Sequence, residues 1–493
     1  MTSAIAVLAA LGPLAPALAA AGPLLARRPT SADRAAQVSA VPAAALIAGL
    51  GGVALARGDE AAHGSWYLLD AAGGVFLLVI SAVGLMSLLA SPAYLRTHAR
   101  TGLGALRSRR LYYLGLFLFW AALAAVPVVD NLGLAWLLVE ATTAASALLV
   151  AYSGSRSALE AGWKYLVLTS IGLTVALLGL VLLYAAASTG EGSLAVLDWN
   201  RLAAAAPALD HDAALVAFVL IVAGLATKVG WAPVHNWLPD AHSEAPPPVS
   251  ALLSAALLPT VALVAWRLDL AVTDAVGEGA RQAVFIGFGL LSLAVAVPFL
   301  WKSLAWKRFL AYSSLEHMGV IALAIGFHHP LATAGALLHV GGHALAKSLG
   351  FLAAVPLLRY QPAAARRAPR GVGRLSRPLA LAMGLSLGSL GGLPPSPLFF
   401  SELLVLLGGI ASGQLAVAAI AAVLLALGFL GVAHMMVESL AGRPTGRRPS
   451  SRHGTRQVAA FGAAAAAGLV ALSVAAYALP GSAVVEALTG AIR

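Results

Sequence analysis

Cysteine is absent from this chain of 493 residues. Without thiols, a chain forms no disulfide bond, offers no thiolate ligand to an iron–sulfur cluster and builds no hydrogenase-type metal centre. We therefore expect this chain to carry no metal and no cofactor. Any electrons that move in the system are expected to move in a partner protein.

Lysine is nearly as scarce, since only five of the 31 basic residues are lysine and the rest are arginine. All five lie in or at the edge of apolar segments: Lys164, Lys228, Lys302, Lys307 and Lys347. Arginine stays charged at any reachable pH, whereas a lysine removed from water can lose its proton near neutrality. A chain that keeps arginine in its loops and lysine in its apolar segments is expected to move protons across a lipid bilayer.

Charge of either sign is rare: 10% of the residues are charged, 60% are hydrophobic and the mean hydropathy is +0.88. Segment after segment exceeds the roughly 18 apolar residues of a membrane-spanning helix, which predicts an all-α polytopic membrane protein. The formal charge of +11 is spread over loops without a basic helix, so nucleic acid is not an expected partner. The apolar run at 1–26 lacks a positive leader, which is typical of a first transmembrane helix rather than a signal peptide.

The hydropathy pattern predicts about 14 transmembrane helices. They cover residues 3–25, 35–56, 68–90, 111–128, 130–152, 161–187, 213–241, 248–270, 280–300, 308–327, 330–357, 379–411, 415–437 and 458–478. Runs of glycine and proline interrupt the seventh and the twelfth helix, so we expect both of these helices to be broken.

The predicted loops alternate in charge. The loops that follow helices 1, 3, 9, 11 and 13 are rich in basic residues, whereas the intervening loops are acidic or balanced. In one such loop, Arg201 is accompanied by Glu191, Asp198 and Asp210. The positive-inside rule then places the basic loops in the cytoplasm and both termini outside it.

Several ionisable residues fall inside the predicted helices, where each costs about 2.5–3.5 kcal/mol and indicates function by default. They are Glu140, Lys164, Lys228, Glu316, His317, His339, His343, Lys347 and Glu402. The spacing of His339, His343 and Lys347 puts all three on one helix face. A buried lysine and a nearby carboxylate titrate as a pair, and histidine suits a relay between such pairs.

Each of these residues also has a structural interpretation. Glu140 and Lys228 can form a purely structural ion pair between helices. A single histidine in a helix is often only an interhelical hydrogen-bond donor. Lys164 lies near a helix end, from which its side chain can reach the membrane surface.

The two predicted breaks occupy corresponding positions in the chain. The first lies in KVGWAPVHNWLPDAHSEAPPPVS at 228–250, which includes His235, and the second lies at 391–397. Paired broken helices are typical of inverted repeats with a transport site between them. We therefore predict two five-helix repeats, helices 4–8 and 9–13. The chain then divides into 1–110, the repeats at 111–272 and 273–440, and a C-terminal loop and helix at 441–493.

Six stretches of the chain resemble the antiporter-like family, which includes the large membrane subunits of respiratory complex I, Mrp-type cation/proton antiporters and group 4 membrane-bound hydrogenases. They are Glu140 with its TTAASALLV tail, EAGWKYLVLTS at 160–170, KVGWAPVHNWLPDAHSEAPPPVSALLS at 228–254, KRFLAYSSLEHMGVIAL at 307–323, HALAKSLGF at 343–351 and GGLPPSPLFFSELLVL at 391–406. Within the family, the chain looks most like the F component of hydrogenase-4.

The resemblance implies a proton pathway along the central plane of a bacterial cell membrane. Its ionisable residues fall on Glu140, Lys164, Lys228, His343, Lys347 and Glu402. One position departs from the pattern, because many complex I members carry a lysine on helix 8, where this chain has Pro259 and no basic residue. The central relay is then expected to rest on water, His235, His339 or His343.

We expect a proton-translocating subunit of a redox-driven complex, not catalytic alone, with membrane and iron–sulfur subunits as partners. One alternative is an Mrp-type antiporter subunit that exchanges protons for a cation such as sodium. Another is a structural subunit that has lost conduction, an alternative motivated by the missing helix 8 lysine.

Overall fold

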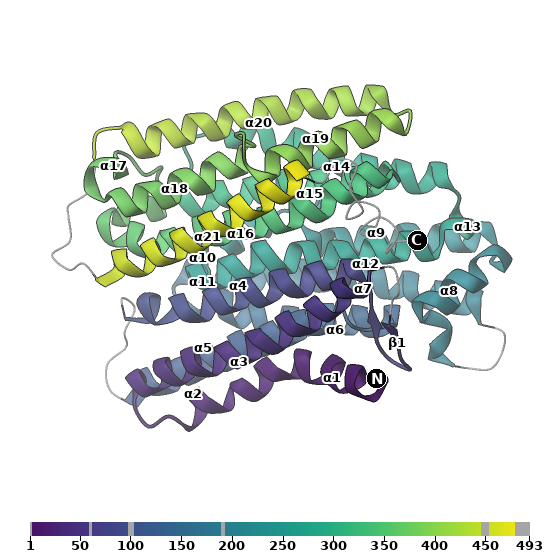
Figure 1. Ribbon diagram of the computed structural model, residues 1–493, viewed down its shortest axis with the longest axis horizontal. Helices are drawn as coiled ribbons and strands as arrows, with labels where there is room; N and C mark the ends of the chain where they lie inside the picture. The colour runs from purple at the N-terminus through teal and green to yellow at the C-terminus, as the bar shows by residue number, and fades with distance from the viewer. Residues whose placement is uncertain (1, 59–61, 97–102, 189–192, 445–452, 479–493) are drawn as a thin grey trace.

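The structure, a computed structural model, describes residues 2–58, 62–96, 103–188, 193–444 and 453–478. These residues are helical almost throughout (Figure 1), so the predicted all-α polytopic membrane fold is confirmed. Glu191 and residues 445–452 and 479–493, which entered the loop and domain predictions, lie outside this part of the chain.

The long helices and their shorter companions follow one another along the chain as α1 (Thr2–Ala19), α2 (Ala21–Leu25), α3 (Pro29–Ala56), α4 (Ala71–Leu95), α5 (Leu103–Ala125), α6 (Leu132–Val150), α7 (Arg156–Ala187), α8 (Trp199–Ala205), α9 (His211–Val229), α10 (Leu238–Glu244), α11 (Pro247–Leu252), α12 (Leu258–Ala271), α13 (Thr273–Val276), α14 (Glu278–Leu300), α15 (Trp306–Gly326), α16 (Pro330–Tyr360), α17 (Val372–Leu375), α18 (Arg377–Leu390), α19 (Pro397–Ala411), α20 (Leu415–Ala441) and α21 (His453–Ala478). Two strands of two residues each, β1 (Ala62–His63) and β2 (Leu68–Leu69), pair as a small antiparallel hairpin that the sequence did not predict.

Eleven stretches of the described helices are long and apolar enough to cross a membrane. Helix α5 is not among these eleven stretches, because Arg107, Arg109 and Arg110 in its first turns make it less apolar. Helices α18 and α19, with 14 and 15 residues, are each shorter than the roughly 20 residues that a crossing requires and together make one passage. With α5, this broken pair and α21, the passages match the fourteen that were predicted.

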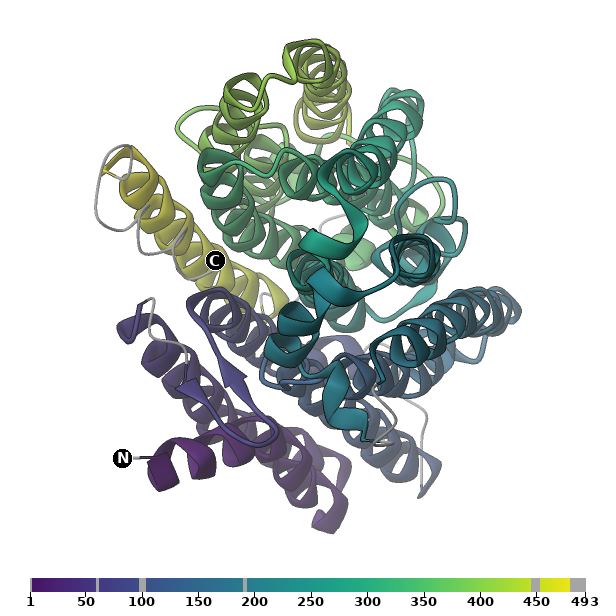
Figure 2. The same cartoon turned by 90° about the vertical axis from the view of Figure 1, so that its right-hand side faces the viewer.

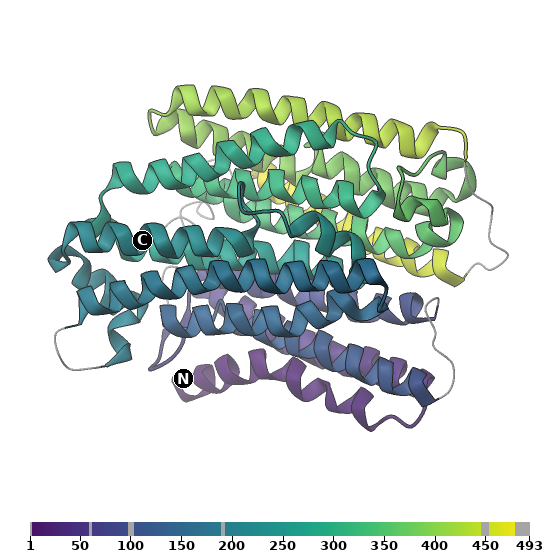
Figure 3. The same ribbon diagram turned by 180° about the vertical axis from the view of Figure 1, so that it is seen from behind.

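The basic and the acidic connections lie at opposite ends of the bundle. The turn between α2 and α3 and the segment around α17 are at one end, whereas β1, α8 and α13 are at the other (Figures 1 and 3). The N-terminal helices form one edge of the bundle and α20 the opposite edge (Figure 3). For these connections, the basic loops and the acidic or balanced loops therefore lie on opposite sides, as the alternation in the sequence predicted.

The buried centre of the bundle is formed by three passages. The apolar stretches of Pro247–Ala271 and α15 are 100% buried within the chain, and that of α16 is 89% buried. The corresponding stretches of α14 and α20 are only 33% and 28% buried. The view along the bundle (Figure 2) shows the N-terminal helices and the helices around α20 on opposite sides of this centre. Helices that are buried on all sides are where polar side chains are kept from lipid.

Buried arginine–aspartate pairs join the helix ends. Arg109 of α5 bonds Asp33 of α3, which also accepts a 2.8 Å hydrogen bond from the hydroxyl of Tyr113. Arg267 of α12 donates to Asp70 at 2.8 Å, and Asp70 is also the N-cap of α4. These pairs fasten the N-terminal helices to one another and to the centre.

Candidate functional site

The seventh passage is broken between α9 and α10, as predicted. Gly230 ends α9 with a φ of +80°, and a Cβ at this position would lie 2.4 Å from Leu238 Cδ1. Only glycine satisfies both the left-handed backbone and this close approach. The chain does not resume a continuous helix after Gly230 because five prolines follow, at positions 233, 239, 246, 247 and 248.

Two tryptophans hold the broken segment in place. The indole N–H of Trp231 donates to the carbonyl of Met318 on α15 at 2.7 Å. The indole of Trp237 donates to the carbonyl of Thr227 near the end of α9 at 2.6 Å. Both side chains are fully buried, so the irregular backbone at membrane depth is surrounded by protein.

Lys228 lies at the end of α9, directly before the break, and is fully buried. Its ammonium donates to Thr143 Oγ1 and to the Tyr165 hydroxyl, both at 2.6 Å. The Tyr165 hydroxyl shares a further hydrogen bond of 2.8 Å with Ser146 Oγ. Helices α6, α7 and α9 thus converge on one lysine whose hydrogen-bond partners are neutral hydroxyl groups. We call these four side chains the first cluster.

Glu140 does not touch Lys228 in this structure. Its Oε1 accepts a 2.8 Å hydrogen bond from Ser170 Oγ on α7, and its buried Oε2 has no hydrogen-bond partner. No salt bridge of 4.0 Å or less joins Glu140 to Lys228, both of which the structure describes. The interpretation of the two residues as a structural ion pair is therefore not supported by their positions.

Lys164 and His235 lie apart from the first cluster. Helix α7 begins at Arg156, earlier than the predicted 161, so Lys164 lies further from the helix start than predicted. Its side chain is about half exposed and is paired with Glu160 at 2.6 Å and Asp240 at 3.6 Å. This position agrees with a side chain that reaches the membrane surface. His235 is partly exposed within the break, and its Nδ1 has no hydrogen-bond partner.

A chain of imidazoles joins α15, α16 and α19. His317 Nδ1 and His339 Nε2 share a hydrogen bond of 3.1 Å, and His339 Nδ1 lies 2.9 Å from Ser401 Oγ. The ring of His343 lies 5.3 Å from the ring of His317 between centroids. All three histidines are buried, and neither ring nitrogen of His343 has a hydrogen-bond partner among the residues that the structure describes. His339 and His343 of α16 thus lie on one face, and the ring of His317 on α15 is close to both of them.

Lys347 follows these histidines on the same face of α16. It is fully buried and donates to the carbonyl of Leu310 at 2.7 Å. Ser314 Oγ donates to the same carbonyl at 2.9 Å and lies 2.8 Å from Ser254 Oγ. Lys347 therefore resembles Lys228 in having a neutral oxygen, and not a carboxylate, as its hydrogen-bond partner. We call Lys347 and the three histidines the second cluster.

The twelfth passage breaks beside Glu402, again as predicted. Gly392, with a φ of +67°, lies so close that a Cβ would be 2.9 Å from Glu402 Oε2. One ligand-type atom each of Glu402, His317 and His339 lies within 4.8 Å of the others, the one such group among the described residues. These atoms could ligate a transition metal, but the hydrogen bond between the two imidazoles is the arrangement of a proton chain.

Glu316 is a second carboxylate in this region, adjacent to His317, and it is buried. Its Oε1 occupies the space above Gly428 of α20, where a Cβ would be 1.9 Å away, and its Oε2 has no hydrogen-bond partner. The glycine on α20 is therefore what makes room for the carboxylate. The sequence drew attention to Glu316 because of its position in an apolar helix.

His242 of α10 lies between the two clusters, and the sequence analysis did not select it. It is fully buried, and neither ring nitrogen has a hydrogen-bond partner in the described part of the chain. Its ring is 6.3 Å from that of Trp237, which packs at 4.7 Å on Tyr165, and 5.4 Å from that of Phe351 on α16. The rings of Tyr165, Trp237, His242 and Phe351 thus form a buried layer that connects the first cluster to α16.

The eighth passage carries hydroxyl groups in the region where the family resemblance implies a lysine. Residues 253–257 form a π-helical turn, of the kind often found at functional sites. Ser254 in this turn makes the bond to Ser314, and the buried hydroxyl of Thr260 has no hydrogen-bond partner. The polar contact across the centre is therefore made by serine. Sequence reasoning missed it because serine in an apolar helix carries no cost that marks it.

Comparison with known proteins gives one family match and several relatives. The family described as "NADH:quinone oxidoreductase/Mrp antiporter, TM" matches residues 129–428. The Hydrogenase-4 component F homolog of Methylacidiphilum infernorum is 36% identical over 376 residues, 74% of this chain and 78% of that protein. NADH-quinone oxidoreductase subunit N of Desulforudis audaxviator is 32% identical over 357 residues, 70% of this chain and 67% of that protein.

A solved structure shares the fold. A chain of the Mrp complex from Dietzia sp. DQ12-45-1b superposes with a TM-score of 0.81 at 20% identity, covering 99% of this chain and 97% of that chain. The match extends the likeness from residues 129–428 to nearly the whole chain at the level of the fold. The resemblance drawn from the sequence motifs is confirmed.

Proposed function

Because the chain belongs to the NADH:quinone oxidoreductase/Mrp antiporter family, we propose that it conducts protons through the membrane as one subunit of a redox-driven complex. It is an antiporter-like, multi-pass membrane protein whose partners are the other subunits of such an assembly. The observation that carries the proposal is that Lys228 and Lys347 are fully buried and that no carboxylate among the described residues contacts either of them.

The chemistry follows from that environment. An ammonium that is removed from water and has no counter-ion is costly, so it readily gives up its proton. A carboxylate that moves toward it stabilises the charged form and restores the proton. Glu140, now bonded to Ser170, is the carboxylate able to make this movement toward Lys228. Pairing loads the lysine, and separation releases the proton to the next site.

The route beyond Lys228 runs along the buried centre. The proton passes from the first cluster by the layer that contains His242 to Lys347, and then through the histidines to Glu402. The hydrogen bond between His317 and His339 provides one direct step. Water at the two helix breaks completes the remaining steps, because irregular backbone at membrane depth is found beside wet cavities or protein.

Orientation and internal symmetry belong to the same proposal. The arginine-rich end of the bundle faces the cytoplasm, which puts the N-terminus of α1 outside the inner membrane. Residues 111–272 and 273–440 form the two inverted repeats, each with one broken helix, α9–α10 or α18–α19. Glu140 and Lys228 serve the first repeat, and the second cluster with Glu402 serves the second.

The two relatives named above favour a redox-driven complex, since they carry the names of a hydrogenase component and an NADH-quinone oxidoreductase subunit. We propose that iron–sulfur subunits of that complex carry the electrons, because this chain has no cysteine to ligate a cluster. Conformational or electrostatic change in a neighbouring subunit would then move Glu140 relative to Lys228.

A cation/proton antiporter of the Mrp type is the second candidate, favoured by the fold match to an Mrp complex. Extraction in mild detergent, followed by mass spectrometry of the proteins that co-purify, separates the two. Iron–sulfur and hydrogenase-like or complex I-like subunits are the expected result. A set of small membrane subunits without a redox protein, together with sodium-dependent antiport, would instead establish the antiporter.

Proton conduction itself is tested by Lys228→Ala in vesicles that contain the intact complex. Dye-detected proton uptake should fall to background while the protein still inserts. The matched control is Lys302→Ala, because Lys302 is exposed at the basic end of the bundle and contacts neither cluster. Full uptake by the Lys228 variant would contradict the proposal and favour a structural subunit that has lost conduction.

A further inference from the structure

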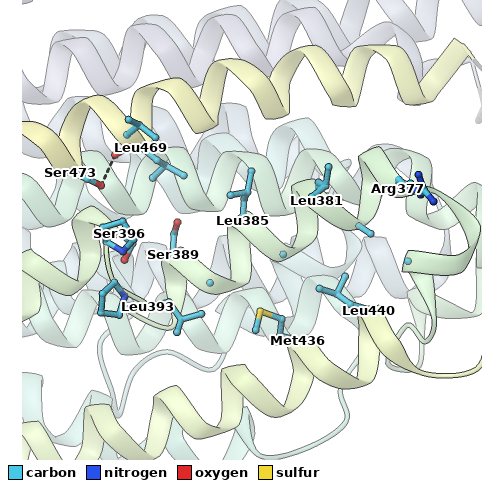
Figure 4. A pocket seen from close by; sticks show the side chains of 17 residues that line it. Arg377, Leu381, Leu385, Ser389, Leu393, Ser396, Met436, Leu440, Leu469 and Ser473 are labelled. Atoms are coloured by element: carbon cyan, nitrogen blue, oxygen red, sulfur yellow. Dashed lines mark hydrogen bonds between the residues drawn. The ribbon is translucent and has the colours of Figure 1, made fainter.

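A long apolar groove runs along the outside of the bundle beside α18. It encloses about 710 Å³ and lies between α18, α20 and α21. Figure 4 shows Arg377 at one end, a row of leucines from α18 along the middle, and Ser396 with Ser473 at the other end. Leu381 and Leu385 are among the exposed large apolar residues, so this wall faces the lipid side.

The groove exists because one face of α18 carries small side chains. Ala380, Gly384 and Gly388 line it. A Cβ at Gly384 would meet Leu440 at 3.3 Å, and one at Gly388 would meet only Leu393 at 3.4 Å. Larger side chains could therefore be accommodated at Gly388 without displacing backbone, and glycine at this position leaves space that the chain itself does not fill.

The polar groups of the groove lie at its ends. The side chain of Arg377 is exposed and makes no hydrogen bond or ion pair with the residues that the structure describes. By contrast, Arg370 in the same connection donates two hydrogen bonds, of 2.9 and 2.7 Å, to Glu438. The groove thus offers one uncompensated guanidinium at the basic end and an apolar surface beyond it.

We infer that the groove binds one anionic phospholipid from the leaflet at the arginine-rich end, with its phosphate at Arg377 and an acyl chain along α18. Guanidinium and phosphate match in charge and hydrogen-bond geometry. The 14 residues of α18 are about 21 Å long, enough to follow a chain through the roughly 15 Å of one leaflet. An acyl chain has no polar group to satisfy inside the groove, whereas a non-helical protein segment brings unsatisfied backbone N–H and C=O groups.

The inner end of the groove is formed by the break of the twelfth passage. Leu393 and Ser396 line the groove, while Gly392, the residue before Leu393, lies against the carboxylate of Glu402. The end of the acyl chain therefore packs against the segment that positions Glu402. The lipid site stands on this geometry and needs no assumption about proton transfer.

Native mass spectrometry from nanodiscs with equal phosphatidylglycerol and phosphatidylcholine tests the head group. The protein within its purified complex should retain phosphatidylglycerol preferentially. Arg377→Gln should reduce that preference about fivefold, the effect of one basic residue near an anionic membrane surface. Arg366→Gln is the matched control, because Arg366 is exposed in the same connection but does not line the groove. Equal retention of both lipids, or no change in Arg377→Gln, would overturn the assignment.

Gly388→Leu tests the acyl chain by filling the groove. The variant should lose the retained phosphatidylglycerol, whereas Gly287→Leu on α14, where a Cβ would meet nothing within 4 Å, should keep it. A photoreactive residue at Leu381 in native membranes should cross-link to lipid. Retention of lipid by Gly388→Leu, or cross-linking of position 381 to a protein subunit, would contradict the site. Neither measurement depends on proton transport, so its failure is distinct from failure of the proposed function.

Discussion

The buried arginines near the ends of the bundle differ from the two buried lysines, Lys228 and Lys347, in its middle. At the ends, an arginine lies against an aspartate, as Arg109 does against Asp33. In the middle, Lys228 bonds two hydroxyl groups and Lys347 bonds a backbone carbonyl. The arginine, which is always charged, has a carboxylate as its permanent partner. Each of the two lysines has no carboxylate partner and is able to lose its charge.

The difference follows from the chemistry of the two side chains. A guanidinium cannot be deprotonated in a protein, so an arginine pair is a fixed connection between helices. For a buried lysine without a carboxylate partner, the charged and the neutral form differ in free energy by only a few kcal/mol. A site that loads and unloads protons requires such a small difference. The contrast predicts that exchanging the two residue types has opposite consequences at the two places.

The largest effect is expected from Lys228→Arg, which keeps the charge and abolishes the ability to lose it. Proton uptake by the intact complex in vesicles should fall by roughly a hundredfold or more, the usual contribution of a positioned proton-transfer group. Lys302→Arg should transport normally. Uptake near the wild-type rate in Lys228→Arg would show that the residue is needed only for its charge.

Asp33→Asn tests the buried arginine–aspartate pair at the end of the bundle. It leaves Arg109 buried without its partner, which typically costs about 3–5 kcal/mol. The free energy of unfolding, measured in detergent or lipid, should fall accordingly, while uptake per folded molecule stays unchanged. Loss of uptake without loss of stability would mean that this pair belongs to the proton path.

A third paired site, at the end opposite the arginine-rich loops, predicts a pH dependence. Asp269 lies 3.6 Å from Arg281 and 3.5 Å from His328, which has a φ of +46°. Burial and the Arg281 guanidinium lower the pKa of His328 from 6.5 to about 4. The unfolded chain therefore binds more protons between these values, and stability is lost as the pH falls from 6.5 toward 4.

The size of that loss is about 2 kcal/mol between pH 7 and 4.5. It is measured as the difference between the wild type and His328→Asn, since other groups titrate in the same range. Asparagine is the replacement of choice because it tolerates a positive φ. An identical pH dependence in both proteins would mean that His328 is charged in the folded state.

The smallest effect is expected from Arg109→Lys. The ammonium keeps its charge beside Asp33 but loses the planar geometry of the guanidinium, which should cost about 1 kcal/mol of unfolding free energy. Uptake should be unchanged. A loss as large as that of Asp33→Asn would show that geometry, and not charge, holds this pair.

The passages and the breaks were predictable because both depend on local sequence. Long apolar runs need the membrane, and a local run of glycine and proline breaks the helix at Gly230 and at Gly392. The start of α5 at Leu103, before the predicted 111, was missed because arginines near a helix end can reach the membrane surface from within the helix.

The residues that complete the clusters could not be predicted in the same way. Lys228 and Lys347 stand out because charge in an apolar helix is expensive. Tyr165 and Ser254 carry no such cost, and their role depends on which helices face one another. The interpretation of Glu140 and Lys228 as a structural ion pair depended equally on facing distances, and no salt bridge joins these two described residues.

The central claim is that Lys228 and Lys347 change their protonation state, whereas the lysines at the surface do not. Since the chain has only five lysines, ¹⁵N labelling of lysine alone in the reconstituted protein gives a spectrum that single substitutions can assign. We predict neutral amine signals that disappear in Lys228→Ala and in Lys347→Ala and persist in Lys302→Ala. Five permanently charged ammonium groups across the pH range of activity would contradict the account.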